Sequence, residues 1–299
     1  MSPSVLIIVL CYNGIELTLA CLESLRRLDY ARADVLVVDN ASSDGTPARV
    51  RERFPEITVI ETGRNLGYAE GNNVGLRHAL DHGYDYALLL NNDTEVAADF
   101  VTELVRVCEA DRTVGVAGPK MYYFEPKGYL YSIGGEVDWR RGTTRMIGLD
   151  QPDDGQFDGP REVDFVSGCA LMARVEAVRQ AGLLDPRFFM YYEETEWCVR
   201  IRRAGWRIVY VPRSVIWHKI EPARQAESAR IAYYMTRNRL LFLKLTRAPI
   251  VAWLHAALLQ DGRTWLSYAV KPKWRHKSAQ RRAMGQAWAD FLRGRFGMA

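Results

Sequence analysis

Short apolar runs alternate with segments of helical spacing along the first 117 residues of the chain. Runs rich in Val, Ile and Leu predict strands at residues 5–10, 35–38, 57–60, 86–90 and 114–117. Apolar residues at helical spacing predict helices at residues 15–28, 46–54, 69–80 and 97–110. This alternation predicts an α/β fold, in which right-handed βαβ units build a mostly parallel, Rossmann-like sheet flanked by helices.

The alternation stops at Pro119, and a stretch rich in Gly, Asp, Tyr and Arg follows to Pro160, where we expect loops and a β-hairpin. Beyond it the pattern predicts strands at 165–172 and 207–211, and helices at 175–181 and 193–204. After Pro222 the chain becomes helical and basic. We therefore expect an α/β domain at residues 1–222. A basic helical extension at 223–299 is expected to pack on that domain or on a membrane surface.

Polar residues gather directly after each of the first four predicted strands. The clusters are Tyr12-Asn13, Asp39-Asn40 with Asp44-Gly45, Arg64-Asn65 with Gly67, and Asn91-Asn92-Asp93. In open parallel α/β sheets, ligands bind in the crevice outside the carboxyl ends of the strands. Asp, Asn and Gly also form turns, so each cluster alone fits an ordinary polar loop. Four clusters at one edge predict a single ligand site.

Charge is divided unevenly along the 299 residues, whose composition is otherwise that of a globular protein. Residues 1–220 hold 25 Lys/Arg against 32 Asp/Glu, a net of −7, whereas residues 221–299 hold 15 against 4, a net of +11. The basic end fits either an anionic partner or a solvated face. The five cysteines form no CxxC pair, which predicts neither a zinc site nor disulfides and fits a reducing compartment. We expect no transmembrane segment.

Four sequence blocks occur in an order that is specific as a set. They are VDNASSDGT (38–46), LLLNNDTEV (88–96), FFMYYEETEWCVRIRRAG (188–205) and VPRSVIWH (211–218). Together they resemble glycosyltransferase family 2, and within it the rhamnosyltransferase-like members, over about residues 4–245. The resemblance implies a GT-A fold and a nucleotide-sugar donor.

The resemblance assigns a donor role to each polar cluster. Asp39 would accept a hydrogen bond from the N3–H of uracil or thymine, and Asp44 would shape the same pocket. Asp93 stands in the family's DxD signature as a ligand of Mg²⁺ or Mn²⁺, but Asn91 replaces the first acid. His218 would complete the metal or diphosphate contact. The remaining donor-side residues implied are Tyr12, Asn13, Arg64, Asn65, Gly67 and Asn92. Asp44 and Asp93 also fit helix caps.

The EETE run carries the predicted general base for inverting transfer, which must take the proton of the acceptor hydroxyl. The family places this base in an acidic pair at the start of a helix, which implies Glu194, with Glu193 as the alternative. Helical spacing also favours Glu194, because it shares a face with Cys198 and Ile201. Glu196 lies four residues before Arg200, and we interpret those two as an ordinary surface pair.

The expected activity is inverting transfer of a sugar from a dTDP- or UDP-sugar to a hydroxyl of a saccharide or lipid-linked saccharide. The resemblance favours L-rhamnose and cell-surface polysaccharide synthesis. The alternative is a catalytically impaired sugar-nucleotide-binding protein, which Asn91 and Glu194 leave open.

We expect a cytoplasmic protein, peripheral on the cytoplasmic face of the inner membrane, with no nucleic-acid partner. An amphipathic basic helix supports this location. Its stripe is Ile231, Tyr234, Asn238, Leu241, Phe242 and Leu245, flanked by Arg230, Arg237, Arg239 and Lys244. Further along, four tryptophans (Trp253, Trp265, Trp274, Trp288) are mixed with Lys271, Lys273, Arg275 and Lys277.

Overall fold

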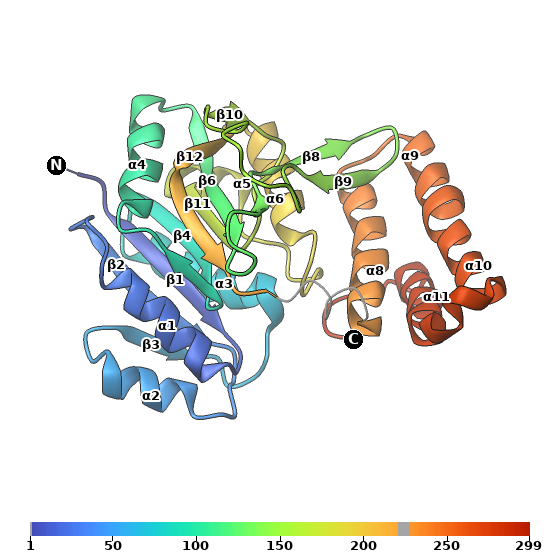
Figure 1. The fold of residues 1–299 in the computed structure, drawn as a ribbon, viewed down its shortest axis with the longest axis horizontal. Coiled ribbons are helices and arrows are strands. Elements are labelled where there is room, and N and C mark those ends of the chain that lie inside the picture. Colours follow the sequence, from blue (N-terminus) through green and yellow to red (C-terminus); the bar gives the residue numbers. More distant parts are fainter. Residues whose placement is uncertain (1, 221–227) are drawn as a thin grey trace.

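The computed structural model describes residues 2–220 and 228–299 (Figure 1). Its main sheet contains β1 (Val5–Cys11), β2 (Ala33–Asp39), β3 (Thr58–Glu61), β4 (Tyr86–Asn91), β5 (Thr94–Val96), β6 (Val114–Tyr123), β7 (Leu130–Ser132), β10 (Arg161–Glu162), β11 (Ala170–Arg174) and β12 (Arg207–His218). The path of the sheet is β10-β12-β6-β11-β4-β1-β2-β3, with β5 paired to β12 and β7 to β6. The strands β3, β2, β1 and β4 are parallel neighbours, as the sequence predicted.

Helices cover both faces of this sheet (Figure 1). They are α1 (Ile15–Leu25), α2 (Thr46–Arg53), α3 (Gly67–Asp81), α4 (Phe100–Ala110), α5 (Val175–Ala181) and α6 (Glu193–Arg203). Apolar side chains of α1, α2 and α4 pack on one face, and those of α3, α5 and α6 pack on the other. Because successive β1 side chains point to opposite faces, both of which are covered, every residue of this strand except Leu10 is buried.

A second group of helices begins at Ala229 and lies beside the α/β domain (Figure 1). It comprises α8 (Ala229–Leu245), α9 (Ile250–Leu254), the π-helical turn η1 (His255–Gly262), α10 (Arg263–Val270), the 3₁₀ helix η2 (Pro272–Lys277) and α11 (Ser278–Leu292). From α8, Leu241, Phe242 and Leu243 enter the same core as α3 and α6. Among the described residues, no helix is both long and apolar enough to cross a bilayer. The expected boundary at 222 lies outside the described residues.

Three expected element boundaries were wrong, and two of them lie at prolines that the strands pass through. β6 continues through Pro119 to Tyr123, and β12 continues beyond Val211 to His218. A register shift between Val211 and Val215 absorbs Pro212, which has no N–H for the ladder. The strand expected at 165–172 begins only at Ala170. Residues 135–138 and 143–146 form the separate hairpin of β8 (Gly135–Asp138) and β9 (Thr143–Met146), in the region where a hairpin was expected.

The basic flank expected on the helix at 229–245 is also corrected. Arg237 and Arg239 are 1% and 3% exposed, so they do not belong to a solvated basic face. Arg237 donates to the carbonyls of Phe188 and Gly297, and Arg239 pairs with Asp261. A guanidinium has five donors and tolerates burial when carbonyls and a carboxylate accept them, which the apolar pattern alone does not reveal.

Candidate active site

The carboxyl ends of four parallel strands place the predicted polar clusters along one edge of the sheet. Cys11 of β1 lies in register with Asp39 of β2, which pairs in turn with Glu61 of β3. On the other side, Leu10 pairs with Asn91 of β4. The loops that follow these strands therefore surround one crevice, which is the arrangement that binds ligands in open parallel sheets.

Asp39 lies at the floor of this crevice and is 1% exposed. One carboxylate oxygen accepts the Ser42 N–H at 2.9 Å, and the other accepts the Cys11 thiol at 3.4 Å. Each carboxylate oxygen has a further lone pair, so Asp39 retains acceptor capacity for a ligand N–H.

Asn40 is a residue that sequence reasoning did not assign to the site. Its buried amide accepts from the Leu66 N–H at 2.9 Å and donates to the Gly67 carbonyl at 2.9 Å. It therefore ties the loop after β2 to the loop after β3, which contains Arg64 and Asn65. The position of Asn40 directly after Asp39 was the sequence feature that could have assigned it to the site. The Arg64 side chain is exposed, and the side-chain amide oxygen of Asn65 accepts the Gly67 N–H.

The loops after β1 and β2 are joined to each other by their own polar side chains. The Asn13 side-chain oxygen accepts the Ser43 N–H at 2.9 Å. Asp44 accepts backbone N–H groups at the starts of two helices, from Ile15 and from Thr46. Asp44 thus holds the starts of α1 and α2 together. The Tyr12 side chain lies at the surface and is 51% exposed.

Gly67 joins the donor-side loops to the loop that precedes α6. Its φ is +77°, and a Cβ on it would lie 2.5 Å from the Phe189 carbonyl oxygen. That oxygen accepts the Tyr68 N–H at 2.6 Å and the Ala69 N–H at 3.3 Å, so it satisfies the first turn of α3. Gly67 is needed for both the left-handed conformation and the close approach.

The three residues of the Asn91-Asn92-Asp93 cluster make different contacts. The Asn92 amide donates to Thr18 at 2.9 Å and holds α1 in place. Asn91 ends β4 and lies against Cys169, with 3.7 Å between its amide nitrogen and the sulfur. Asp93 follows in the turn to β5, and the Lys219 N–H donates to its carbonyl at 2.8 Å.

Asp93 and His218 meet because β5 pairs with the end of β12. Thr94 lies opposite His218 in this antiparallel ladder. As a result, His218 Nε2 is 3.2 Å from Asp93 Oδ1. Burial lowers the pKa of His218, but Cys169 and Asp93 raise it to about 10. A cation bound here would therefore displace a proton from the ring.

The residues present fit a divalent cation that shares its coordination with a substrate. Asp93 Oδ1 is buried without a hydrogen bond of good geometry, although His218 is close. In the described part of the chain, no three His, Cys, Asp or Glu side chains converge on one point. Mg²⁺ is commonly held by one or two protein carboxylates together with substrate phosphates and water. A carboxylate and an imidazole are consistent with that kind of site.

Glu193 and Glu194 begin α6 at the opposite wall of the crevice. Glu193 is 4% exposed, and each of the two side chains has one buried oxygen without a hydrogen-bond partner among the described residues. Burial raises the pKa of Glu194 to about 7. Burial and the neighbouring Glu194 hold the pKa of Glu193 well above its usual range. Burial therefore disfavours the ionised form of both carboxyls.

The backbone before these glutamates is unusual. Phe189, Tyr191 and Tyr192 all have positive φ, at 65°, 69° and 73°. Non-glycine residues in this conformation are held by their surroundings and concentrate at functional sites. Here the Asn238 amide of α8 donates to the carbonyls of Phe188, Met190 and Tyr191.

Tyr131 of β7 connects the glutamate pair to the Asp93–His218 pair. Its ring meets that of His218 edge to face, with 4.8 Å between the ring centroids. Cys169, burial and the charge of Glu194 all raise the pKa of Tyr131 above its usual range. Tyr131 lies in the variable region that the sequence pattern did not resolve. Tyr131 thus contacts His218 and lies within electrostatic reach of Glu194.

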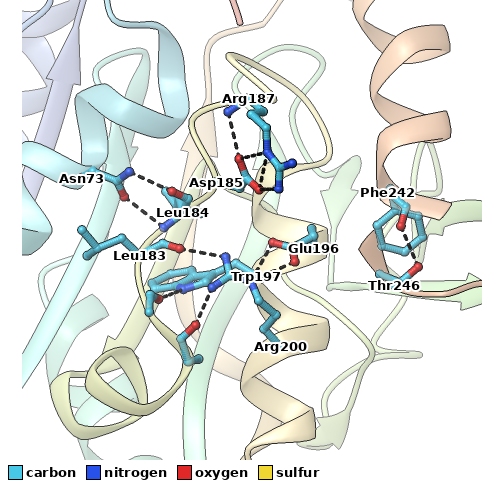
Figure 2. Close-up of polar contacts among 12 residues, drawn as sticks. Asn73, Leu183, Leu184, Asp185, Arg187, Glu196, Trp197, Arg200, Phe242 and Thr246 are labelled. Atoms are coloured by element: carbon cyan, nitrogen blue, oxygen red, sulfur yellow. Dashed lines mark hydrogen bonds and ion pairs between the residues drawn. The ribbon is translucent and has the colours of Figure 1, made fainter. Parts of the chain in front are cut away.

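The expected surface pair of Glu196 and Arg200 is instead a buried clamp on α6, which corrects that expectation. Glu196 is 4% exposed and accepts two hydrogen bonds from Arg200 Nε, both at 2.8 Å. Figure 2 shows Arg200 reaching from this carboxylate to the Leu183 carbonyl, 2.8 Å away. Beside it, Trp197 donates to the Gly182 carbonyl at 2.6 Å. The sequence pattern suggested an exposed pair because residues 181–187, which cover Glu196 and Arg200, form a loop whose sequence has no periodicity.

Comparison with known proteins agrees with this geometry. A family model described as "Glycosyl transferase family 2" matches residues 6–181. The fold and site define a GT-A type α/β protein, and the chain belongs to glycosyltransferase family 2. One similar structure is the mannosyltransferase PcManGT from Pyrobaculum calidifontis in complex with GDP-Man and Mn²⁺. It has a TM-score of 0.60 and 19% identity, over 98% of this chain and 88% of that one.

Curated relatives include several enzymes named as rhamnosyltransferases. The N-acetylglucosaminyl-diphospho-decaprenol L-rhamnosyltransferase of Mycobacterium tuberculosis is 29% identical over 203 residues, 62% of this chain and 66% of that protein. The dTDP-rhamnosyl transferase RfbF of Shigella flexneri is 24% identical over 84% of this chain and 83% of its own length. The low-salt glycan biosynthesis hexosyltransferase Agl10 of Haloferax volcanii is 31% identical over 70% of this chain and 66% of that protein. The chain thus spans slightly less than two thirds of the mycobacterial and haloarchaeal relatives.

Proposed function

We propose that this protein is an inverting, divalent-metal-dependent glycosyltransferase that moves a sugar from a dTDP- or UDP-sugar onto an acceptor hydroxyl. The observation that supports the proposal is the Glu193–Glu194 pair at the start of α6, with Tyr131 within electrostatic reach of Glu194 and against His218, which pairs with Asp93. A base and a diphosphate-binding pair in one crevice are what a single displacement at the sugar C1 requires.

Glu194 is the proposed general base. Burial raises its pKa to about 7, so near neutral pH a large fraction is ionised and each carboxylate still has a strong affinity for a proton. It removes the acceptor hydroxyl proton as that oxygen bonds to C1, and the bond from C1 to the nucleoside diphosphate breaks. Burial and the charge of Glu194 raise the pKa of Glu193, and protonation of Glu193 would limit the repulsion between the two carboxyls.

The donor is proposed to lie along the edge formed by β2, β1 and β4. Asp39 accepts the N3–H of uracil or thymine, a charge-assisted bond inside a buried pocket. Asp93 and His218 hold Mg²⁺ or Mn²⁺, and Asn91 offers an amide oxygen where a second acid would add charge. When bound, the cation neutralises charge on the donor diphosphate and its leaving oxygen.

L-rhamnose is the proposed sugar, and a saccharide carried on a lipid is the proposed acceptor. The support is that relatives from Mycobacterium tuberculosis and Shigella flexneri are named for rhamnosyl transfer, the former to a decaprenol-linked acceptor. We further propose that the enzyme works at the cytoplasmic face of a membrane. Five buried free thiols fit that reducing compartment.

Calorimetric titration tests the donor site. dTDP-rhamnose, UDP-glucose, UDP-galactose and GDP-mannose are each titrated with Mn²⁺ and with EDTA, into wild type and Asp93→Ala. We expect one thymidine or uridine donor to bind, and binding to weaken at least tenfold with EDTA or in Asp93→Ala. Asp99 is an exposed aspartate in the loop before α4, so Asp99→Ala is the matched control and should bind the donor as wild type does.

Preference for GDP-mannose, or donor binding that EDTA does not change, would contradict the proposal. Binding without turnover in the presence of acceptor would favour an impaired binding protein.

A further inference from the structure

A long apolar stripe of the C-terminal helices faces solvent. It consists of Ile250, Leu254, Leu258, Leu266 and Val270, whose exposed fractions are 73%, 53%, 64%, 54% and 65%. These residues are spaced by four or eight along α9, η1 and α10. In an ideal α-helix a four-residue repeat drifts around the axis, but the wider π-helical turn η1 corrects the drift. The five side chains therefore share one face, which we call the outer stripe.

The opposite face of the same helices is anchored to the rest of the molecule. Ala252 and Ala256 are fully buried and belong to the core that contains α3 and α6. Asp261 is buried and pairs with Arg239 of α8, and it also accepts the Trp288 indole N–H of α11 at 3.2 Å. The run from α9 to α10 lies at the outer edge of the molecule, with α8 and α11 on its inner side (Figure 1). The outer stripe is thus held outward by a fixed support.

Basic residues lie beside the outer stripe, and residues 228–299 supply no exposed acid to balance them, although Asp138 of β8 lies within electrostatic reach of His255. Residues 228–299 contain two acidic side chains, Asp261 and Asp290, and both are buried, at 4% and 7% exposure. Exposed basic residues close in sequence to the stripe are Arg247 just before it, Arg263 within it, and Lys271, Lys273 and Arg275 just after it. An exposed apolar row of this extent marks an interaction surface. The basic border specifies an anionic partner.

We infer that α9, η1 and α10 lie in the interface of an anionic lipid bilayer, with the outer stripe among the acyl chains and the basic residues at the headgroups. An apolar helix face with a cationic border binds a membrane surface in this way, lying in its plane. The inference deepens the proposed function, because it rests on an acceptor that is carried on a lipid. A second copy of the chain fits less well, since a symmetric contact would bring each basic border against itself.

Vesicle flotation of the full chain tests the inference, without donor or acceptor. The vesicles are phosphatidylcholine alone, and phosphatidylcholine mixed with phosphatidylglycerol. We expect binding to the mixed vesicles only. The double variant Leu258→Ser/Leu266→Ser should lower the partition coefficient by about tenfold per leucine. Lys271→Glu, Lys273→Glu and Arg275→Glu should each lower it by at least roughly fivefold. The matched controls are Leu149→Ser and Arg112→Glu, exposed residues of the α/β domain, and they should bind as wild type does.

Three results would overturn the inference. The first is a wild-type chain that does not float with either kind of vesicle. The second is a double leucine variant that floats as well as wild type. The third is a wild-type dimer in sedimentation that the leucine changes dissociate. Because the assay contains no nucleotide sugar, its failure is separate from failure of the proposed transfer. Unchanged donor binding by the leucine variant shows that the variant is folded.

Discussion

At the residue scale, the environment of Glu194 makes a pH-dependent activity the direct expectation. The base must be ionised to accept a proton, and burial raises its pKa to about 7. We expect kcat to rise with pH through about 7 and to level off about one unit higher. Glu194→Gln should lower kcat by about 10²- to 10⁴-fold and change donor affinity by less than about twofold. Initial rates and calorimetry measure the two quantities. Glu176→Gln, on the exposed side of α5, is the control.

The same carboxyl links stability to pH. Its folded pKa of about 7 lies above the usual 4.5, so the folded state binds more protons between those values. The stability that the protonated group contributes is complete below about pH 4.5 and is lost as the pH rises to about 7. Glu194→Gln should therefore raise the free energy of unfolding at pH 8 by on the order of 1–3 kcal/mol, with little effect at pH 4. Urea unfolding at the two pH values measures this. An equal effect at both would contradict the pKa assignment.

At the element scale, the contact between α3 and the loop before α6 determines where the glutamate pair stands. Gly67→Ala puts a Cβ 2.5 Å from the Phe189 carbonyl oxygen at a φ of +77°. We expect a loss of stability of more than about 2 kcal/mol, and a lower kcat because that loop must move. Gly63→Ala is the matched control, since its φ is +71° with nothing within 4 Å of the added carbon. It should cost about 1 kcal/mol and leave kcat unchanged. Thermal unfolding and initial rates measure both variants.

The elements also show what could be read from the sequence. The strands that were predicted well, such as β1 and β4, are short apolar runs bounded by polar loops, and their parallel order follows from the helices between them. The extended ends of β6 and β12 were missed because Pro119 and Pro212 look like strand breaks. Tyr131 was missed because β7 has three residues and no period to detect. Glu196 is buried because a loop covers it, and the spacing of residues along a helix cannot predict such a contact.

At the scale of the whole molecule, the C-terminal helices are part of the site as well as a separate surface. Asn238 of α8 is fully buried, and its amide donates to the Phe188, Met190 and Tyr191 carbonyls at 2.8, 2.7 and 3.0 Å. These carbonyls belong to the loop of positive φ values that begins α6. A residue more than 40 positions later in the chain thus supports the loop that precedes the proposed general base.

Asn238→Ala tests this long-range support. The substitution leaves buried carbonyls without donors and opens a small cavity, so we expect about 2–4 kcal/mol of destabilisation. It should also lower kcat at least tenfold while donor affinity changes little, because the donor edge of the sheet lies outside this contact. Met235→Ala, on the exposed side of the same helix, is the control and should alter neither quantity. A variant that loses stability but keeps wild-type kcat at a temperature where it is fully folded would show that α8 supports the fold alone. A fall in kcat with intact donor binding would show that α8, which is paired through Arg239 to Asp261 of η1, also positions the proposed general base, so that the proposed membrane contact and catalysis would share one rigid support.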